Sequence, residues 1–272
     1  MLAPGISRAL SLSIFLFPSH YRANIIAPRD PPDGATPGRI WDDTLDLHKL
    51  ATAPTVAHVP TDLQVGAANT DTLHTAIVNP TFVLGRSPSK THAPPGLFPY
   101  LLSALKAVGG AFVIGPGKNM SGFVENSELA KVYVALVGDA LKHLPGGEKA
   151  VEAVNEEVWG PKGYFFGTGL EISWREFIED YLVPSLKRCG GEAWVPGEET
   201  KEMDMEEVVN LMVTIIGNGD HAVAWGRHIA LGLGVAMRVR PTRTKKYLGV
   251  EIGTELPGLD DAVRATLAAM KA

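Results

Sequence analysis

The clearest hydrophobic pattern in the chain lies between residues 73 and 86, LHTAIVNPTFVLGR. Its run Ala76-Ile77-Val78 is apolar and partly β-branched, which is typical of a strand covered on both faces of a parallel sheet. Pro80 has no backbone N–H for the ladder, so the strand is predicted to stop there. The segment therefore predicts a buried strand followed by a short apolar run, Phe82-Val83-Leu84, that ends at Gly85.

Helical periodicity is clearest between Leu129 and Leu141, where apolar residues recur at spacings of three and four. Asn126 or Ser127 precedes this pattern and is the predicted N-cap of a helix that packs one face on a sheet. A further helical pattern covers residues 202–211. These segments predict helices that alternate with strands.

A capping box predicts the start of another helix, because Ser173 is followed three residues later by Glu176. Pro184 is expected to interrupt or kink this helix, since it has no N–H to donate to the preceding turn. Strand, helix and loop patterns alternate along the chain without a repeat or a low-complexity tract. The alternation favours an α/β domain with a parallel sheet.

Composition and charge mainly exclude classes of partner and of covalent cross-link. The 272 residues are 45% hydrophobic, and no linker divides them cleanly, so we expect one domain with a lobe. The net charge of −5 provides no basic field, so neither nucleic acid nor a membrane is a predicted partner. A single cysteine, Cys189, excludes an internal disulfide and fits a reducing compartment, which predicts a cytoplasmic protein.

The N-terminal part has a short apolar run, Ala9 to Phe17. A secretory signal can contain such a run, but no small-x-small cleavage site follows it. It is also too short for a membrane span, which needs about 20 residues. The run is alternatively a strand of the sheet or an unrelated start. We divide the chain into a divergent N-terminal segment and loop, residues 1–38, and a domain, residues 39–272.

The order of several short motifs resembles the NAD-dependent epimerase/dehydratase family, which is the extended type of short-chain dehydrogenase. In that family an Arg-Pro or Asn-Pro pair precedes a Tyr-Gly, and here Asn79-Pro80 precedes Phe82-Val83-Leu84-Gly85. Residues 124–130, VENSELA, occupy the place of a Val-His-Val-Asp-Asp-Leu-Ala signature, with Glu125 at the His. Later matches are Gly163-Tyr164-Phe165-Phe166, Ser173-Trp174 and Tyr247-Leu248-Gly249. The sequence is most similar to the atypical fungal-type members.

The resemblance implies an α/β fold with a Rossmann-like doubly wound parallel sheet, incomplete at the N-terminal side, and a small C-terminal substrate-type lobe. It implies NAD or NADP as cofactor, a small molecule with a hydroxyl or carbonyl group as substrate, and oxidoreductase or isomerase activity. Asn79, Pro80 and Thr81 would border the nicotinamide. The substrate side would be lined by Gly85, Arg86, Phe98, Val124 and Glu125. Glu125 either faces the ligand cleft or is a partly solvated carboxylate near a helix N-terminus.

Two parts of the family pattern are absent. No Gly-x-x-Gly-x-x-Gly turn lies near the N-terminus, so the resemblance covers the C-terminal two-thirds of the family's chain, and we expect little dinucleotide affinity. Where the family has Tyr-x-x-x-Lys, the sequence runs from His58 to Asp62. An aspartate cannot lower the pKa of a neighbouring acid, which leaves His58 as the candidate base.

We therefore expect the family chemistry to be impaired or absent in this chain. One alternative is a non-catalytic interaction or sensing module. Another is a truncated gene product. In an interaction module, an unpaired sheet edge would favour aggregation or dimerisation, so a homodimer is a possible partner state.

Three other strings have competing interpretations. Gly217 to Ala222 fits Gly-x-Gly-x-x-Ala after an apolar run, which is a dinucleotide turn or, as we favour, a loop between two helices. Gly115 to Lys118 is predicted to be a turn, since it lacks the other residues of a phosphate loop. Asp42, Asp43 and Asp46 have, with His48, spacings that could coordinate a cation, but we favour a solvated helix face. The histidines form no metal-binding string, so no metal site is predicted.

Overall fold

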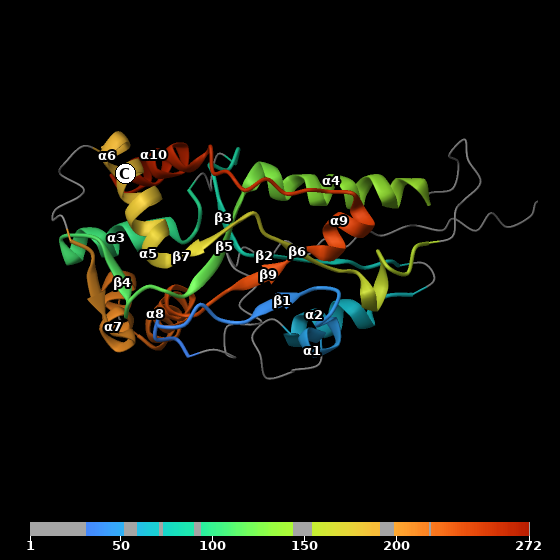
Figure 1. Cartoon of the computed structure of the whole chain (residues 1–272), viewed down its shortest axis with the longest axis horizontal. Coiled ribbons are helices and arrows are strands. Elements are labelled where there is room, and N and C mark those ends of the chain that lie inside the picture. Colours follow the sequence, from blue (N-terminus) through green and yellow to red (C-terminus); the bar gives the residue numbers. More distant parts are fainter. Residues whose placement is uncertain are drawn as a thin grey trace, which may run out of the picture.

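The computed structural model describes residues 31–51, 59–70, 73–89, 94–143, 154–190, 199–217 and 219–271. The apolar run at 9–17 and the candidate base His58 lie outside these residues. Strands run through the middle of the molecule, with α3, α7 and α8 at one end and α4 along one side (Figure 1). Among the described helices, none combines the length and apolar composition needed to cross a membrane.

Short strands form the centre of the fold. In chain order they are β1 (Ile40–Asp42), β2 (Ile77–Pro80), β3 (Phe82–Leu84), β4 (Phe112–Ile114), β5 (Met120–Glu125), β6 (Tyr164–Gly167), β7 (Leu170–Ser173), β8 (Lys201–Met203) and β9 (Arg238–Arg240). The pairs β1–β9, β2–β6, β3–β5 and β4–β8 are parallel, and β5–β7 is antiparallel. A parallel bridge between Ser121 and Met237 joins β5 to the chain just before β9. The predicted α/β class with parallel strands is confirmed.

The helices are α1 (Leu47–Ala51), α2 (Val59–Ala67), α3 (Phe98–Val108), α4 (Asn126–Lys142), α5 (Trp174–Glu176), α6 (Val183–Gly190), α7 (Met205–Ile216), α8 (Asp220–Gly234), α9 (Thr242–Leu248) and α10 (Leu259–Ala269). One large apolar cluster fills the space between most of them. A smaller cluster lies beneath α4 and includes Val78, Val124 and Phe165. The core therefore consists of a large cluster that extends from α1 and α2 to α3, α7 and α8, and a smaller one on the underside of α4.

The predicted break at Pro80 is present, because β2 ends at that residue and β3 begins at Phe82. The helix predicted at 129–141 is also present, although its N-cap is Glu125 rather than Asn126 or Ser127. Its extended backbone, with φ −67° and ψ 138°, continues the strand β5 directly into the helix. No loop separates strand from helix here, so the preference of serine and asparagine for caps does not decide the boundary.

The helix predicted from Ser173 begins as expected, since the Glu176 N–H donates to Ser173 Oγ at 3.1 Å. A π-helical stretch, Phe177–Leu182, follows and leads into α6, which contains Pro184. Proline cannot donate to the preceding turn, and a π-helical turn is one way in which a helix accommodates such a site. The expected interruption near Pro184 is thus present as a change from π-helix to α-helix between Leu182 and Val183.

The pattern predicted as helical at 202–211 is shifted toward the C-terminus. Residues 201–203 form β8, and Asp204 then caps α7 in a reciprocal capping box with Glu207. The apolar run at 212–216 belongs to α7, so Gly217 and Gly219 lie between two helices. A dinucleotide turn needs a strand before it. That interpretation is therefore wrong, and the loop between helices is confirmed.

The prediction of a solvated acidic face is wrong for Asp43 and Asp46, which are 0% and 6% exposed. Asp43 follows β1 and turns inward, where Phe166 N–H donates to its Oδ2 at 3.0 Å and Arg243 N–H donates to its Oδ1 at 2.9 Å. Burial outweighs these two hydrogen bonds and raises the pKa of Asp43 to about 7. A long-range contact of this kind leaves no periodic signal in the sequence.

We expect the free energy of unfolding to fall as the pH rises. The folded state holds the proton of Asp43 more tightly, so this contribution is complete below pH 3.8 and is lost as the pH passes about 7. The total loss is on the order of 4 kcal/mol. Urea unfolding between these pH values measures the slope.

Asp43→Asn removes the titrating group, so its unfolding free energy should change less across the same pH range. The variant should also be less stable at low pH, because an amide cannot accept both backbone bonds. Asp180→Asn, at an exposed aspartate, is the matched control and should keep the wild-type slope. Equal slopes in wild type and Asp43→Asn would contradict this account.

Candidate functional site

A pocket of about 630 Å³ lies at the carboxyl ends of the parallel strands β3 and β5. Residues 83 and 85–88, which belong to or follow β3, form one side, and residues 94–96 form another. Asn126, Ser127 and Ala130, at the start of α4, complete it. We call this the β3–β5 pocket. The carboxyl ends of parallel strands are where ligands bind in open α/β folds.

Glu125, the last residue of β5, lies directly behind Gly85 and is 4% exposed. A β-carbon added to Gly85 would lie 2.0 Å from Glu125 Oε1, and one added to Gly258 would lie 2.4 Å from the same atom. Gly258 N–H also donates to Glu125 Oε2 at 3.3 Å. The carboxylate is therefore held between two glycines, and neither position has room for a side chain.

Burial raises the pKa of Glu125, and the nearby charges of Asp261 and Glu128 act in the same direction. The interpretation of Glu125 as a partly solvated carboxylate is therefore wrong. A carboxyl group with a raised pKa beside a pocket is a candidate for proton transfer. In this arrangement Gly85 separates the carboxylate from the pocket.

Arg86 is exposed and lines the β3–β5 pocket. Its carbonyl accepts a hydrogen bond from Asn126 Nδ2 at 2.8 Å, which ties the chain after β3 to the start of α4. The pocket is thus lined by Arg86 on one side and by Ser127 on the other. Asn126 and Ser127 were predicted only as helix caps. Both residues directly follow a buried strand in the sequence, and this position could have indicated that they line a pocket.

Asn79 and Thr81, predicted to border a nicotinamide, are both 0% exposed. The Thr81 hydroxyl lies 3.1 Å from the Thr168 hydroxyl, within hydrogen-bond distance. Both amide atoms of Asn79 lack a hydrogen-bond partner in the structure. Pro80 lies between them at the end of β2. These three residues do not line the β3–β5 pocket.

The other predicted substrate residues lie in the core. Phe98 and Val124 are 0% exposed and belong to the larger and the smaller apolar cluster, respectively. Of the five, the structure therefore brings Gly85 and Arg86 to the pocket, places Glu125 behind it, and leaves two in packing positions. Across the described residues, no group of three or more His, Cys, Asp or Glu side chains could hold a metal ion.

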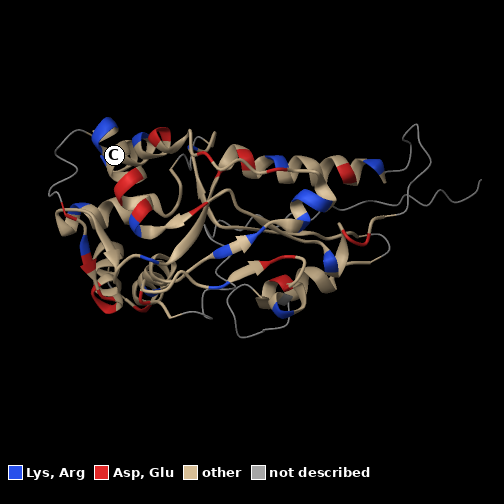
Figure 2. Cartoon of the chain, viewed as in Figure 1, with Lys and Arg blue, Asp and Glu red and all other residues tan. Residues whose placement is uncertain are grey.

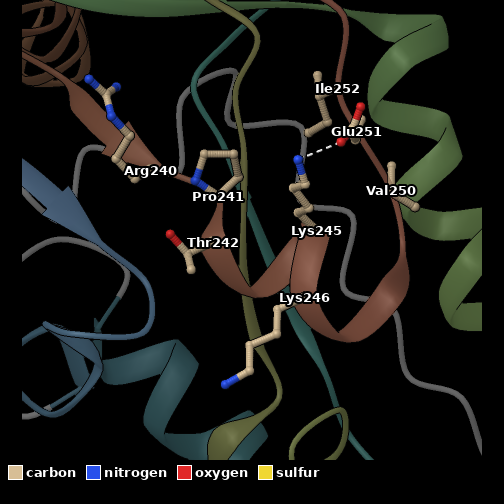
Figure 3. A pocket seen from close by; sticks show the side chains of 8 residues that line it. All are labelled: Arg240, Pro241, Thr242, Lys245, Lys246, Val250, Glu251 and Ile252. Atoms are coloured by element: carbon tan, nitrogen blue, oxygen red, sulfur yellow. Dashed lines mark ion pairs between the residues drawn. The ribbon is translucent and has the colours of Figure 1, made fainter.

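A second pocket of about 630 Å³ lies beside α9 and is lined by Arg240, Lys245, Lys246 and Glu251 among others (Figure 3). Arg240 pairs with Glu171 at 2.9 Å, and Lys245 pairs with Glu251 at 2.5 Å. Figure 3 shows Lys245 and Lys246 pointing in opposite directions. The cations do not converge on one point, and two of them are neutralised, so we assign no anion site here.

No protein-family model matches the chain, and no curated protein matches it by sequence. Among solved structures, human epimerase family protein SDR39U1 (isoform 2), solved with NADPH, aligns over 86% of this chain and 61% of its own, at 16% identity and TM-score 0.46. The UDP-glucuronic acid 4-epimerase from Bacillus cereus, in complex with UDP-glucuronic acid and NAD, aligns over 73% and 46%, at 11% identity and TM-score 0.40.

The terminal R domain from the myxalamid PKS-NRPS biosynthetic pathway aligns over 78% of this chain and 49% of its own, at 12% identity and TM-score 0.46. The chain thus spans less than two thirds of the length of each of these proteins. Likenesses this weak transfer neither an activity nor a cofactor to the chain.

Gly85→Ala should destabilise the fold more than Gly109→Ala. Both glycines have positive φ, +93° and +72°, but an added β-carbon meets Glu125 at Gly85 and nothing within 4 Å at Gly109. The left-handed backbone costs each variant about 1–2 kcal/mol. Overpacking should add about 1–3 kcal/mol at Gly85 alone. Urea unfolding measures both losses.

Adding Glu125→Ala to Gly85→Ala should recover part of the extra loss, because it removes the side chain that the new methyl group meets. The double-mutant cycle isolates this coupling. If Gly85→Ala and Gly109→Ala cost the same, or if the cycle gives no coupling, Glu125 does not lie behind Gly85.

Proposed function

We propose that the chain binds a small molecule with a hydroxyl or carbonyl group in the β3–β5 pocket, as a protein of the epimerase/dehydratase type. The observation that carries this proposal is the meeting of Gly85 and Arg86 with the first turn of α4 around one pocket. The family resemblance implies a substrate-side position for both residues. The chain has a single cysteine and so cannot form an internal disulfide, which favours a cytoplasmic location.

The pocket suits a polar ligand of moderate size. Its volume of about 630 Å³ falls in the range of small-molecule sites. Arg86 and Asn126 donate hydrogen bonds, and the Ser127 hydroxyl donates or accepts. Glu125 is a carboxyl group directly behind the pocket wall, and its raised pKa favours a proton-holding role. A ligand must displace the backbone at Gly85 to reach it.

A nicotinamide dinucleotide fits the described residues only in part. Asn79 offers a buried donor and acceptor that match a carboxamide group. The pyrophosphate needs backbone N–H groups at a glycine-rich turn and a helix N-terminus. Within the described residues no strand is joined to a helix by such a turn, since Gly115 and Gly117 follow β4 but lead into β5, and Gly217 and Gly219 lie between two helices. We therefore infer weak NAD or NADP binding and derive no hydride transfer for this chain.

A ligand-sensing module without turnover is the second candidate. It is favoured by Asp62, which stands where the family pattern places a catalytic lysine. Asp62 lies on α2 and is 6% exposed, so it offers no positive charge to lower the pKa of a neighbouring acid. In this candidate the pocket recognises the ligand, and association or stability changes in response.

Titration with NADH and NADPH, followed by cofactor fluorescence, should give dissociation constants of about 1 mM or weaker, equivalent to roughly 4 kcal/mol of binding free energy. The physical reason is the missing pyrophosphate cradle. Micromolar binding would contradict the inference and would place a cradle outside the described residues. Asn79→Ala should then separate carboxamide recognition from the rest of the affinity.

Small sugars, hydroxy acids and ketones at millimolar concentration test the pocket itself. Amide NMR shifts should concentrate at residues 85–87 and 126–130. Arg86→Ala should weaken the binding of anionic or carbonyl ligands about tenfold, as expected for one lost charged hydrogen bond. Arg227→Ala, at an exposed arginine of α8, is the control and should bind as wild type does. Shifts at other sites, or no binding by any compound, would overturn the proposal.

A further inference from the structure

A smaller cavity, of about 310 Å³, lies beside α2, which is on the other side of the strands from α4 (Figure 1). Residues 62, 63, 66 and 67 of α2 form one side of it. Ile77 and Tyr164, the first residues of β2 and β6, form the opposite side together with Gly160, Pro161 and Gly163. We call this the α2 cavity. Its volume is near the lower end of the range for small-molecule sites.

The α2 cavity is separate from the β3–β5 pocket. Ile77 and Tyr164 pair with each other where their parallel strands begin, so the cavity lies at the amino ends of β2 and β6. Open α/β folds bind their usual ligands at the carboxyl ends of the strands, where the β3–β5 pocket lies. No described residue lines both. The two spaces therefore have to be explained independently.

The lining of the α2 cavity combines apolar groups with one buried carboxylate. Ile77 and Pro161 supply apolar side chains, and Tyr164 supplies an aromatic ring that is 4% exposed. Among the described residues that line the cavity, Asp62 is the one with a charged side chain. It is 6% exposed and lies on the buried face of α2. The cavity is therefore apolar with an acidic group in its wall.

The position of Asp62 is unusual for a charged residue of a helix. It is the one charged residue of α2, whereas α4 alternates acidic and basic residues along its length (Figure 2). A carboxylate on the inner face of a helix costs free energy unless it is hydrogen-bonded or paired with a cation. Its two oxygens have about four lone-pair sites, so it can accept from a ligand as well as from groups of the chain.

We propose that the α2 cavity binds a small organic cation that carries a primary ammonium group on a short apolar or aromatic body. The ammonium group would donate hydrogen bonds to the Asp62 carboxylate, and bonds between two charged groups are the strong ones. The face of the Tyr164 ring would attract the same cation. The apolar body would pack on Ile77 and Pro161. An anion of the same shape would be repelled by Asp62.

The chain leaves room for such a ligand at Gly66. A β-carbon added to Gly66 would have no heavy atom within 4 Å, and the residue lies within α2 without a positive φ. A larger side chain at this position can therefore enter the cavity without backbone strain. It also suits a helix better than glycine does. Gly66 thus allows a variant that folds and lacks the site.

Three probes of similar shape and different charge test the ligand class. They are benzylamine, benzyl alcohol and benzoate, each titrated into the full chain and followed by amide NMR shifts. Benzylamine should shift residues 62–67, 77 and 163–164. Benzyl alcohol should bind there about tenfold more weakly, as expected when a charged hydrogen bond is lost, and benzoate should not bind there. Equal binding of benzylamine and benzoate, or no benzylamine shifts at these residues, would overturn the proposal.

Gly66→Leu should abolish the benzylamine shifts at the cavity, and its melting temperature should not fall below that of wild type. Gly138→Leu is the matched control, since Gly138 lies within α4 and a β-carbon there also meets nothing within 4 Å. It should bind benzylamine as wild type does. Equal binding by the two variants means that the ligand does not occupy the α2 cavity.

Asp62→Asn keeps the shape of the side chain and removes its charge. It should weaken benzylamine binding about tenfold and leave benzyl alcohol binding unchanged, a difference that general loss of folding would not produce. Asp180→Asn, at an exposed aspartate, should bind both probes as wild type does. Wild-type affinity of Asp62→Asn for benzylamine would contradict the role of the carboxylate and overturn the proposal.

The proposal does not rest on the function proposed for the β3–β5 pocket. Ligands of that pocket shift residues 85–87 and 126–130, whereas benzylamine shifts α2 and the first residues of β2 and β6. Failure at one set of residues leaves the result at the other set unchanged, so the two proposals fail separately.

Discussion

The carboxylate of Asp43 joins three parts of the chain that lie far apart in sequence. It follows β1 and accepts one hydrogen bond from Phe166 in β6 and another from Arg243 in α9, which are 123 and 200 residues away. The strands themselves are three to six residues long, so their ladders alone hold few bonds. A buried group that satisfies two backbone donors at once fixes how β1, β6 and α9 lie together.

Other buried polar side chains act in the same way at the ends of other strands. Asn119 Nδ2 donates to the carbonyls of Leu233 and Val235 at 3.0 and 2.8 Å, which connects the start of β5 to the end of α8. Glu125 accepts from Gly258 across 133 residues. The β3–β5 pocket therefore lies on a framework held by side-chain-to-backbone bonds as well as by apolar packing. Its wall at Gly85 is fixed by the carboxylate behind it.

The sequence predicted the local elements well because their signals are local. The apolar run before Pro80, the periodicity of α4 and the Ser173 cap all depend on neighbours within a few residues. The pairing of Gly85 and Arg86 with the start of α4 was expected only through the order of the motifs. The burial of Asp43 was not predictable in this way, because it depends on donors from β6 and α9. The same holds for Glu125, whose environment includes Gly258.

The limits of the sequence are also evident where one pattern has two structural meanings. The run at 212–216 is apolar and β-branched, as a strand before a dinucleotide turn would be, yet it ends a helix. The capping box of Asp204 and Glu207 settles the choice, since it starts α7 seven residues upstream of the run and the helix continues without a break. A cap signal and the apolar run had to be considered together, because neither decides the element alone.

The helix α4 forms one side of the β3–β5 pocket. Its buried face packs on Val124 and Phe165 and so fixes its rotation about its own axis. That rotation turns Ala130 toward the pocket and keeps Val134 and Leu141 outward.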